Sequence, residues 1–236
     1  MEIIAHRGAS SLAPENTLLS IQKAIDLHAH IIEIDCQLTR DQRVIVFHDV
    51  TIDNFAHAGA VRVSDLTYAQ LQIIDLGKEQ KIPLLEDVLA LVGKKSKLMI
   101  ETKTTGTSLK VLDTAYDCKM MDSIALTSSL IPEILIARKY LPGLPVSLVI
   151  KYYPINFDDV VRLYNIREFS IDRTFITGQI VQTLKNKGYL LRVFTVNDIS
   201  DAAVYETWGV DGIFTDYPQR FILPELIPVK AGSKRA

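Results

Sequence analysis

The order of strand-like and helix-like segments limits most strongly what this chain can fold into. Eight short apolar runs have the length and β-branched content of buried strands, at residues 2–6, 31–35, 97–101, 123–127, 146–150, 168–171, 190–195 and 212–215. Between them lie amphipathic segments that read as helices, several opened by Thr, Asp or Pro, at residues 16–28, 108–117, 131–140, 157–164, 177–187 and 199–208.

Such alternation of strands and helices specifies a parallel sheet covered by helices. Eight units in a chain of 236 residues favour closure into a (β/α)8 TIM barrel, formed as a single domain by residues 1–223. An open doubly wound sheet is the structural alternative. The absence of a Gly-x-Gly-x-x-Gly phosphate turn from the sequence argues against it.

The segment that follows the second strand departs from the alternation. A polar turn at residues 40–42 and a β-branched run at 44–47 predict an antiparallel hairpin. If the turn centres on Arg40 and Asp41, His48 comes opposite Glu33 and Val46 comes opposite Asp35. Residues 49–81 then precede a helix that opens near residues 82–86. Long loops in compact domains are usually functional, so we predict a small insertion at 49–81 over the barrel mouth, forming one wall of a substrate pocket.

Two acids stand two positions apart on the second strand. Because strand side chains alternate between faces, Glu33 and Asp35 share one face of the strand. Neighbouring carboxylates repel each other and are costly to desolvate, so they predict a cation between them, and oxygen ligands favour Mg²⁺, Ca²⁺ or Mn²⁺. The alternative is an exposed hairpin with scattered charge. The apolar runs 31–32 and 44–47 favour buried strands instead.

Further charged residues follow other strands. Glu101 and Lys103 end the third strand on one face and offer a third oxygen ligand and a fixed cation for an anionic substrate. His6 ends the first strand and Arg7 follows it, so these groups meet at the edge on which barrel enzymes build their sites. Asp216 reaches the same edge, where a turn or a helix cap explains it equally well.

Composition excludes several other classes of protein. A net charge of −2 with evenly mixed signs argues against nucleic-acid binding. Cys36 and Cys118 lie in no metal-binding pattern and are expected to be free thiols. The sequence has neither an apolar run long enough to cross a membrane nor a secretory leader pattern, so we expect a cytoplasmic protein without a transmembrane segment. Residues 224–236 are polar and basic and predict a loosely held tail.

An ordered series of motifs carries a family resemblance. The series consists of His6-Arg7-Gly8, Pro14-Glu15-Asn16-Thr17, Glu33-x-Asp35, Leu38-Thr39-x-Asp41, His48-Asp49, Glu101-x-Lys103, Thr195-Val196-Asn197 and Gly209-Val210-Asp211-Gly212. In order and spacing it resembles the glycerophosphodiester phosphodiesterase family. No single motif is specific, but the ordered set is.

The resemblance implies a barrel phosphodiesterase of the type shared with phosphatidylinositol-specific phospholipases. It implies a divalent cation held by Glu33, Asp35 and Glu101, acid-base catalysis by His6 and His48, and hydrolysis of a small glycerophosphodiester to sn-glycerol 3-phosphate and an alcohol. Stabilising the charge that develops on the phosphate oxygens needs fixed cations, and the substrate-binding candidates for this are Arg7 and Lys103.

Three positions differ from the family pattern. Phe194 stands where Trp is typical, Ser128-Ser129-Leu130 replaces the usual Ser-Phe, and Asn54 follows Asp53 where Arg is common. None of them is a proposed metal ligand or histidine, so they bear on substrate preference. Two alternatives therefore stay open: a phosphodiesterase for lysophospholipids, of the lysophospholipase D type, and a non-catalytic relative that only binds phosphodiesters.

Overall fold

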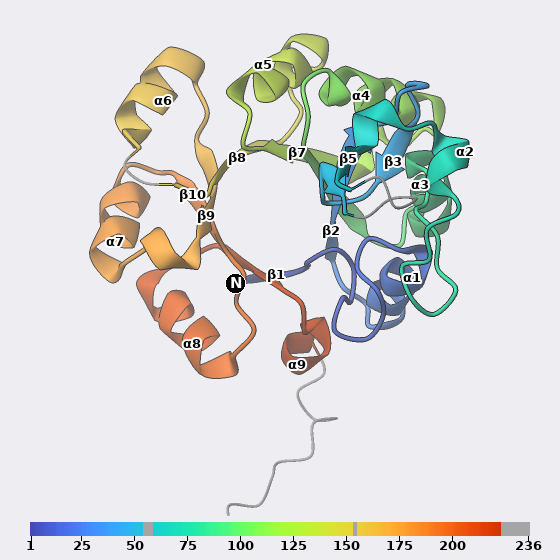
Figure 1. The fold of residues 1–236 in the computed structure, drawn as a ribbon. Helices are drawn as coiled ribbons and strands as arrows, with labels where there is room; N and C mark the ends of the chain where they lie inside the picture. The colour runs from blue at the N-terminus through green and yellow to red at the C-terminus, as the bar shows by residue number, and fades with distance from the viewer. Residues whose placement is uncertain (54–58, 153–154, 223–236) are drawn as a thin grey trace, which may run out of the picture.

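The chain folds into a closed barrel of eight parallel strands with helices around its outside (Figure 1). The computed structural model describes residues 1–53, 59–152 and 155–222. The strands are β1 (Glu2–Ala5), β2 (Ile31–Leu38), β6 (Lys97–Thr102), β7 (Ile124–Ser128), β8 (Val146–Ile150), β9 (Glu168–Asp172), β10 (Leu190–Phe194) and β11 (Gly212–Thr215). Their order around the barrel is β1, β11, β10, β9, β8, β7, β6, β2, and pairing of β2 with β1 closes it. The predicted TIM barrel is confirmed.

Helices follow most of the strands and pack on the outer face of the barrel. They are α1 (Leu18–Asp26), α3 (Leu85–Val92), α4 (Thr107–Asp117), α5 (Ile131–Tyr140), α6 (Phe157–Tyr164), α7 (Gly178–Asn186), α8 (Ile199–Trp208) and α9 (Pro218–Ile222). Local caps set several starts, as the sequence signals predict. The hydroxyl of Thr17 accepts a hydrogen bond from the N–H of Ser20, so α1 begins two residues later than the predicted 16–28 segment.

The hairpin that β2 forms with β3 (Val44–Val46) has a different register from the predicted one. Val46 pairs with Cys36 and not with Asp35, and Val44 pairs with Leu38. Beyond this pair the N–H of Thr39 donates to the carbonyl of Arg43 at 3.1 Å, so the turn contains three residues, 40–42, and not two. Gln42 lies in the left-handed region at φ 60°. Such a three-residue turn shifts the pairing by one position and removes the predicted placement of His48 opposite Glu33.

The inserted segment builds a small unit of its own beside the barrel. It contains β4 (Thr51–Ile52) paired with β5 (Val61–Arg62), a 3₁₀ turn (Val63–Asp65) and α2 (Tyr68–Leu71). Val63, Leu66 and Leu71 pack with Ile45 of β3 in a separate apolar cluster. That the segment 49–81 lies over the barrel mouth stays a prediction, and residue 54 and the tail 224–236 fall outside the described residues.

The two faces of β2 show how the fold positions polar groups. Ile32, Ile34 and Cys36 face outward and are fully buried against the surrounding helices. Glu33 and Asp35 point into the barrel, as their spacing predicts. Cys36 and Cys118 are free cysteines, as expected. Within the part of the chain that the structure describes, no helix is both long enough and apolar enough to span a bilayer.

Candidate active site

A tight turn after β1 brings the first two site residues into place. Arg7 and Gly8 both have positive φ, at 55° and 80°. A Cβ atom on Gly8 would lie only 2.6 to 2.8 Å from side-chain and backbone atoms of Ser20, so this position accepts only glycine without a shift of α1. The turn points the backbone N–H of Arg7 at Oε2 of Glu33, 2.9 Å away.

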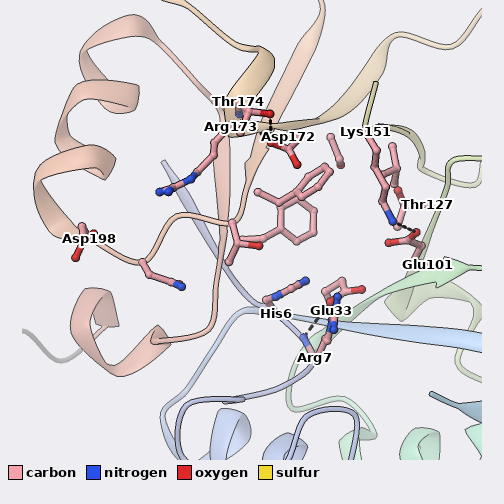
Figure 2. Close-up of a pocket in the computed structure, with 16 residues that line it drawn as sticks. His6, Arg7, Glu33, Glu101, Thr127, Lys151, Asp172, Arg173, Thr174 and Asp198 are labelled. Atoms are coloured by element: carbon pink, nitrogen blue, oxygen red, sulfur yellow. Dashed lines mark hydrogen bonds and ion pairs between the residues drawn. The ribbon is translucent and has the colours of Figure 1, made fainter. Parts of the chain in front are cut away.

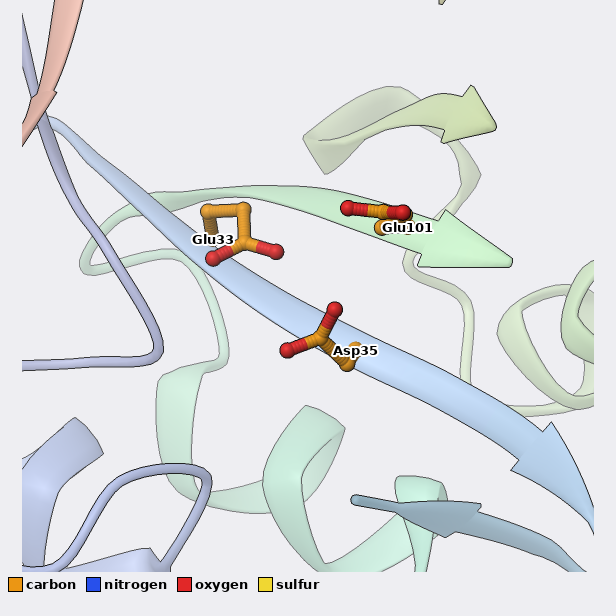
Figure 3. A group of neighbouring side chains, drawn as sticks. All are labelled: Glu33, Asp35 and Glu101. Carbon is orange, nitrogen blue, oxygen red and sulfur yellow. The ribbon is translucent and has the colours of Figure 1, made fainter. Parts of the chain in front are cut away.

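Three carboxylates from two neighbouring strands converge inside the barrel (Figure 3). Asp35 on β2 is directly paired with Glu101 on β6, and Glu33 lies two residues before Asp35 on the same face. One oxygen from each of the three lies within 4.8 Å of the others. All three residues are buried: Glu33 is 2% exposed, Asp35 1% and Glu101 9%. The predicted convergence of the three acids is therefore observed.

Burial makes this acid cluster electrostatically demanding. Burial and the neighbouring charge of Asp35 together raise the pKa of Glu33 to about 8. Burial also acts to raise the pKa of Asp35, but the charges of Lys103 and Arg7 outweigh it and the pKa of Asp35 is lowered. Glu33 therefore holds a proton unless more positive charge is nearby. Three closely spaced carboxylates of this kind suit a hard divalent cation as ligands.

Cationic side chains surround the same oxygens. Nζ of Lys103 lies 3.0 Å from Oε1 of Glu101 and 3.3 Å from Oδ1 of Asp35. Nζ of Lys151, directly after β8, lies 3.2 Å from the same Glu101 oxygen. Nε of Arg7 is 3.2 Å from Oδ2 of Asp35, in an orientation that makes no hydrogen bond. The cluster therefore offers fixed positive charge to an anionic ligand as well as oxygens to a cation.

An asparagine holds the central acid of the cluster in place. Nδ2 of Asn16 donates to Oδ2 of Asp35 at 2.9 Å, and the backbone N–H of Asp35 donates to Oδ1 of Asn16 at 3.1 Å. Asn16 itself has a positive φ of 56° and is buried. This reciprocal pair fixes the orientation of the Asp35 carboxylate from outside the cluster.

His6 belongs to a second polar chain at the barrel rim. Its Nδ1 lies 2.7 Å from Oδ1 of Asp216, whose other oxygen accepts a hydrogen bond of 2.8 Å from Nδ2 of Asn197. Burial acts to lower the pKa of His6, but the hydrogen bond to Asp216 and the charge of Glu33 outweigh it, so the pKa of His6 is raised. Burial acts to raise the pKa of Asp216, yet the hydrogen bonds from His6 and Asn197 lower it to about 2.

His48 lies apart from these groups. Its Nδ1 is 2.7 Å from Oδ1 of Asp49, and its side chain is 28% exposed. It is close enough to Asp35 for its charge to contribute to the lowered pKa of that carboxyl. His48 is not, however, among the residues that line the cavity over the acid cluster.

A cavity of about 550 Å³ opens over the acid cluster at the carboxyl end of the barrel (Figure 2). His6, Arg7, Glu33 and Glu101 line one side of it, and Lys151 borders Glu101. Lys103 and Asp35 lie beneath this surface, in contact with the lining residues. The described residues of the 49–81 segment contribute no side chain to the lining.

The sequence did not assign Asn16, Lys151 or Asp216 to the site. Asn16 lay in a recognised motif without a role, and Asp216 was left between a turn and a cap. Lys151 shows the same sequence signal as Glu101, namely a charged residue at the end of an apolar strand. Searching the end of every predicted strand for a charged residue would have identified Lys151.

The fold and the mixed charges at its rim define a barrel hydrolase suited to anionic esters. A model of the "Glycerophosphoryl diester phosphodiesterase family" matches residues 6–220. A glycerophosphodiester phosphodiesterase of Bacillus subtilis is 30% identical over 92% of this chain and 84% of its own length. This chain therefore belongs to the glycerophosphoryl diester phosphodiesterase family, as the motif series predicts.

Two further relatives bear on substrate and fold. A phosphodiesterase from Oleispira antarctica, solved in complex with the product sn-glycerol-3-phosphate, superposes with a TM-score of 0.81 at 25% identity and covers 93% of this chain and 94% of its own. A lysophospholipase D from Rattus norvegicus is 23% identical over 92% of this chain and 83% of its own length.

Proposed function

We propose that this chain hydrolyses glycerophosphodiesters to sn-glycerol 3-phosphate and an alcohol in a reaction that depends on a divalent cation. The observation that carries the proposal is the convergence of Glu33, Asp35 and Glu101 within 4.8 Å, beside a cavity lined by His6. The names of the bacterial relatives and the sn-glycerol-3-phosphate held by the Oleispira antarctica enzyme support the substrate class.

Glu33, Asp35 and Glu101 are the proposed ligands of Mg²⁺, Ca²⁺ or Mn²⁺, since each offers a buried carboxylate oxygen. Such a cation, when bound, supplies positive charge to the phosphate oxygens. Arg7 and Lys103 add fixed positive charge at the same place and are the proposed phosphate-binding residues. Lys151, which contacts the same Glu101 oxygen as Lys103, is a further proposed phosphate-binding residue.

His6 and His48 are the proposed acid-base pair. In each, Nδ1 contacts an aspartate oxygen at 2.7 Å, which leaves Nε2 to exchange protons. One imidazole removes the proton from the nucleophile, and the other protonates the departing alkoxide. If the nucleophile is water, sn-glycerol 3-phosphate forms directly. If it is the glycerol 2-hydroxyl of the substrate, a cyclic phosphodiester forms first, and water then opens it to sn-glycerol 3-phosphate. Support is strongest for His6, because it lines the cavity and its pKa is raised.

The deciding experiment measures cleavage of three esters by protein treated with EDTA and then supplied with Mg²⁺, Ca²⁺ or Mn²⁺ one at a time. The esters are glycerophosphocholine, glycerophosphoethanolamine and lysophosphatidylcholine. We expect no cleavage with EDTA, recovery with at least one cation, and faster cleavage of the two glycerophosphodiesters.

A matched pair of variants tests the proposed ligands. Glu101→Gln removes one carboxylate from the cluster and is expected to abolish the recovery by metal. Glu86→Gln makes the same change on α3, where Glu86 forms an exposed ion pair with Arg43. This variant should leave the activity unchanged. Preferential cleavage of lysophosphatidylcholine would move the protein to the lysophospholipase D type, and metal-dependent binding of the esters without cleavage would make it a non-catalytic relative.

A further inference from the structure

The side of the cavity opposite the acid cluster carries a carboxylate that the proposed reaction does not use. Asp172 is the last residue of β9, and β9 lies four strands from β2 in either direction around the barrel. Asp172 therefore faces the cavity from across the barrel. Figure 2 shows its carboxylate directed into the space that His6 and Glu33 border from the other side.

Asp172 is held in a fixed orientation. Its Oδ1 accepts hydrogen bonds from the backbone N–H of Thr174 at 2.8 Å and from the Thr174 hydroxyl at 2.7 Å. The residue is half-buried, so its charge is only partly screened by water. A carboxylate fixed by two donors to one oxygen keeps the other oxygen for a ligand.

Each cationic side chain that lines the cavity already contacts another carboxylate. These contacts are Arg7 with Glu15 and Asp35, Lys151 with Glu101, His6 with Asp216, and Arg173 with Asp201. Figure 2 shows the Arg173 guanidinium turned away from the cavity. Among the residues that the structure describes, Asp172 has no cationic partner within 4.0 Å. Asp198, the other acid on this side, is 68% exposed, with Arg220 at 3.9 Å.

An aromatic surface lies directly beside Asp172. Phe194 on β10 is the register partner of Asp172, and both line the cavity. The Phe194 ring meets the Phe214 ring edge to face, with 6.1 Å between centroids, so its orientation is fixed by packing. A carboxylate next to an aromatic ring is a combination that recognises ammonium groups, through ionic attraction and through the negative face of the ring.

We infer that this side of the cavity binds the leaving alcohol and selects an alcohol with a positively charged nitrogen, of the ethanolamine or choline type. This inference rests on the proposed function, because the phosphate must lie at the acid cluster for the alcohol to reach Asp172. Asp172 and Phe194 act here as specificity-determining residues and take no part in the proton transfers.

The test uses three diesters that share the glycerophosphate half and differ in the alcohol. Glycerophosphoethanolamine and glycerophosphocholine carry a cationic alcohol, and glycerophosphoglycerol carries a neutral one. Dissociation constants are measured by calorimetry with Ca²⁺ present, on a His6→Ala background that the proposed function predicts to be inactive. Asp172→Asn keeps an oxygen for both Thr174 hydrogen bonds and removes the charge.

We expect Asp172→Asn to weaken binding of the two cationic diesters by about tenfold and to leave glycerophosphoglycerol unchanged. Phe194→Leu should weaken the choline diester more than the glycerol diester. Asp159→Asn, in an exposed ion pair with Arg162 on α6 and outside the cavity lining, is the matched control and should change none of the three. An equal change for all three diesters in Asp172→Asn, or no change for any, would overturn the inference.

Turnover is measured separately on the protein with His6 restored. If it cleaves none of the diesters but the binding series shows the charge preference, the alcohol site stands and the proposed activity fails. If it cleaves all three and Asp172→Asn affects them alike, the activity stands and the alcohol site fails.

Discussion

The hydrogen-bonded chain from His6 through Asp216 to Asn197 makes Asp216→Asn a sharp perturbation. Asn197 cannot turn over, since its Oδ1 accepts from the backbone N–H of residue 216 at 2.9 Å, and its Nδ2 therefore stays directed at residue 216. An asparagine there must turn its oxygen toward either His6 or Asn197. The first choice sets two NH₂ groups against each other, and the second sets an NH₂ group against Nδ1 of His6 and forces the other imidazole tautomer.

The free energies involved follow from the ionisation of the pair. The fall in the pKa of Asp216 from 3.8 to about 2 corresponds to roughly 2 kcal/mol, and screening at a side chain that is 33% exposed leaves about 1 kcal/mol. Because this pKa is lowered, the stabilisation is present above pH 3.8 and is lost as the pH falls toward 2. Because the pKa of His6 is raised, the stabilisation that protonated His6 contributes to the fold is present below pH 6.5 and is lost as the pH rises through the raised pKa.

Two measurements check this reasoning. Urea unfolding between pH 3.8 and pH 6.5, where both groups of the pair are charged, should show Asp216→Asn destabilised by about 1 kcal/mol. The kcat for diester cleavage should fall by ~10²- to 10⁴-fold, because the imidazole is held in the wrong tautomer or loses its orienting carboxylate. Ser10→Ala removes a 3.2 Å hydrogen bond to the same carboxylate without affecting the tautomer, and it should cost less than about tenfold. A kcat near that of the unmodified protein in Asp216→Asn, with an unchanged pH profile, would refute the argument.

Two further predictions test the turn after β1 and the second histidine. Gly8→Ala should destabilise the protein by about 2 to 4 kcal/mol in urea unfolding, because the new Cβ meets the backbone of Ser20. Gly188→Ala, at a similar φ of 76° but with nothing within 4 Å, should cost only about 1 kcal/mol, and equal losses would contradict the steric reason. His48→Ala should lower kcat by at least ~10²-fold in the same cleavage assay. Near-normal turnover in that variant would remove His48 from the acid-base pair.

The barrel was predictable from the sequence because its signals are local and repeated. Each strand is a short apolar run, and segments such as Val146–Ile150 begin and end where the pattern predicts. The turn after β2 was mispredicted, since a left-handed residue in a three-residue hairpin turn is usually Gly or Asn and here is Gln42. Without that signal the sequence does not distinguish a two-residue from a three-residue turn.

The acid cluster was predictable for a related reason. Alternation along β2 fixes Glu33 and Asp35 on one face whatever the rest of the chain does, and the parallel neighbour β6 then supplies Glu101. The contact between His6 and Asp216 joins residues 210 positions apart and depends on barrel closure. Ala5 pairs with Thr215 only because β1 and β11 meet, so the role of Asp216 emerges from tertiary structure.

The contacts within the cluster also explain why the cationic side chains stand where they do. Lys103 and Lys151 both contact Oε1 of Glu101, whose carboxylate belongs to the proposed cation site. A divalent cation bound there would compete with the two ammonium groups for the Glu101 carboxylate. If the carboxylates turn to a cation, Lys151 at the cavity edge and Lys103 beneath it would lose these partners, and a phosphate oxygen in the cavity would offer a replacement. Under the proposed function, binding of the cation would therefore favour binding of the anionic ester, because it would free the ammonium groups that the ester needs.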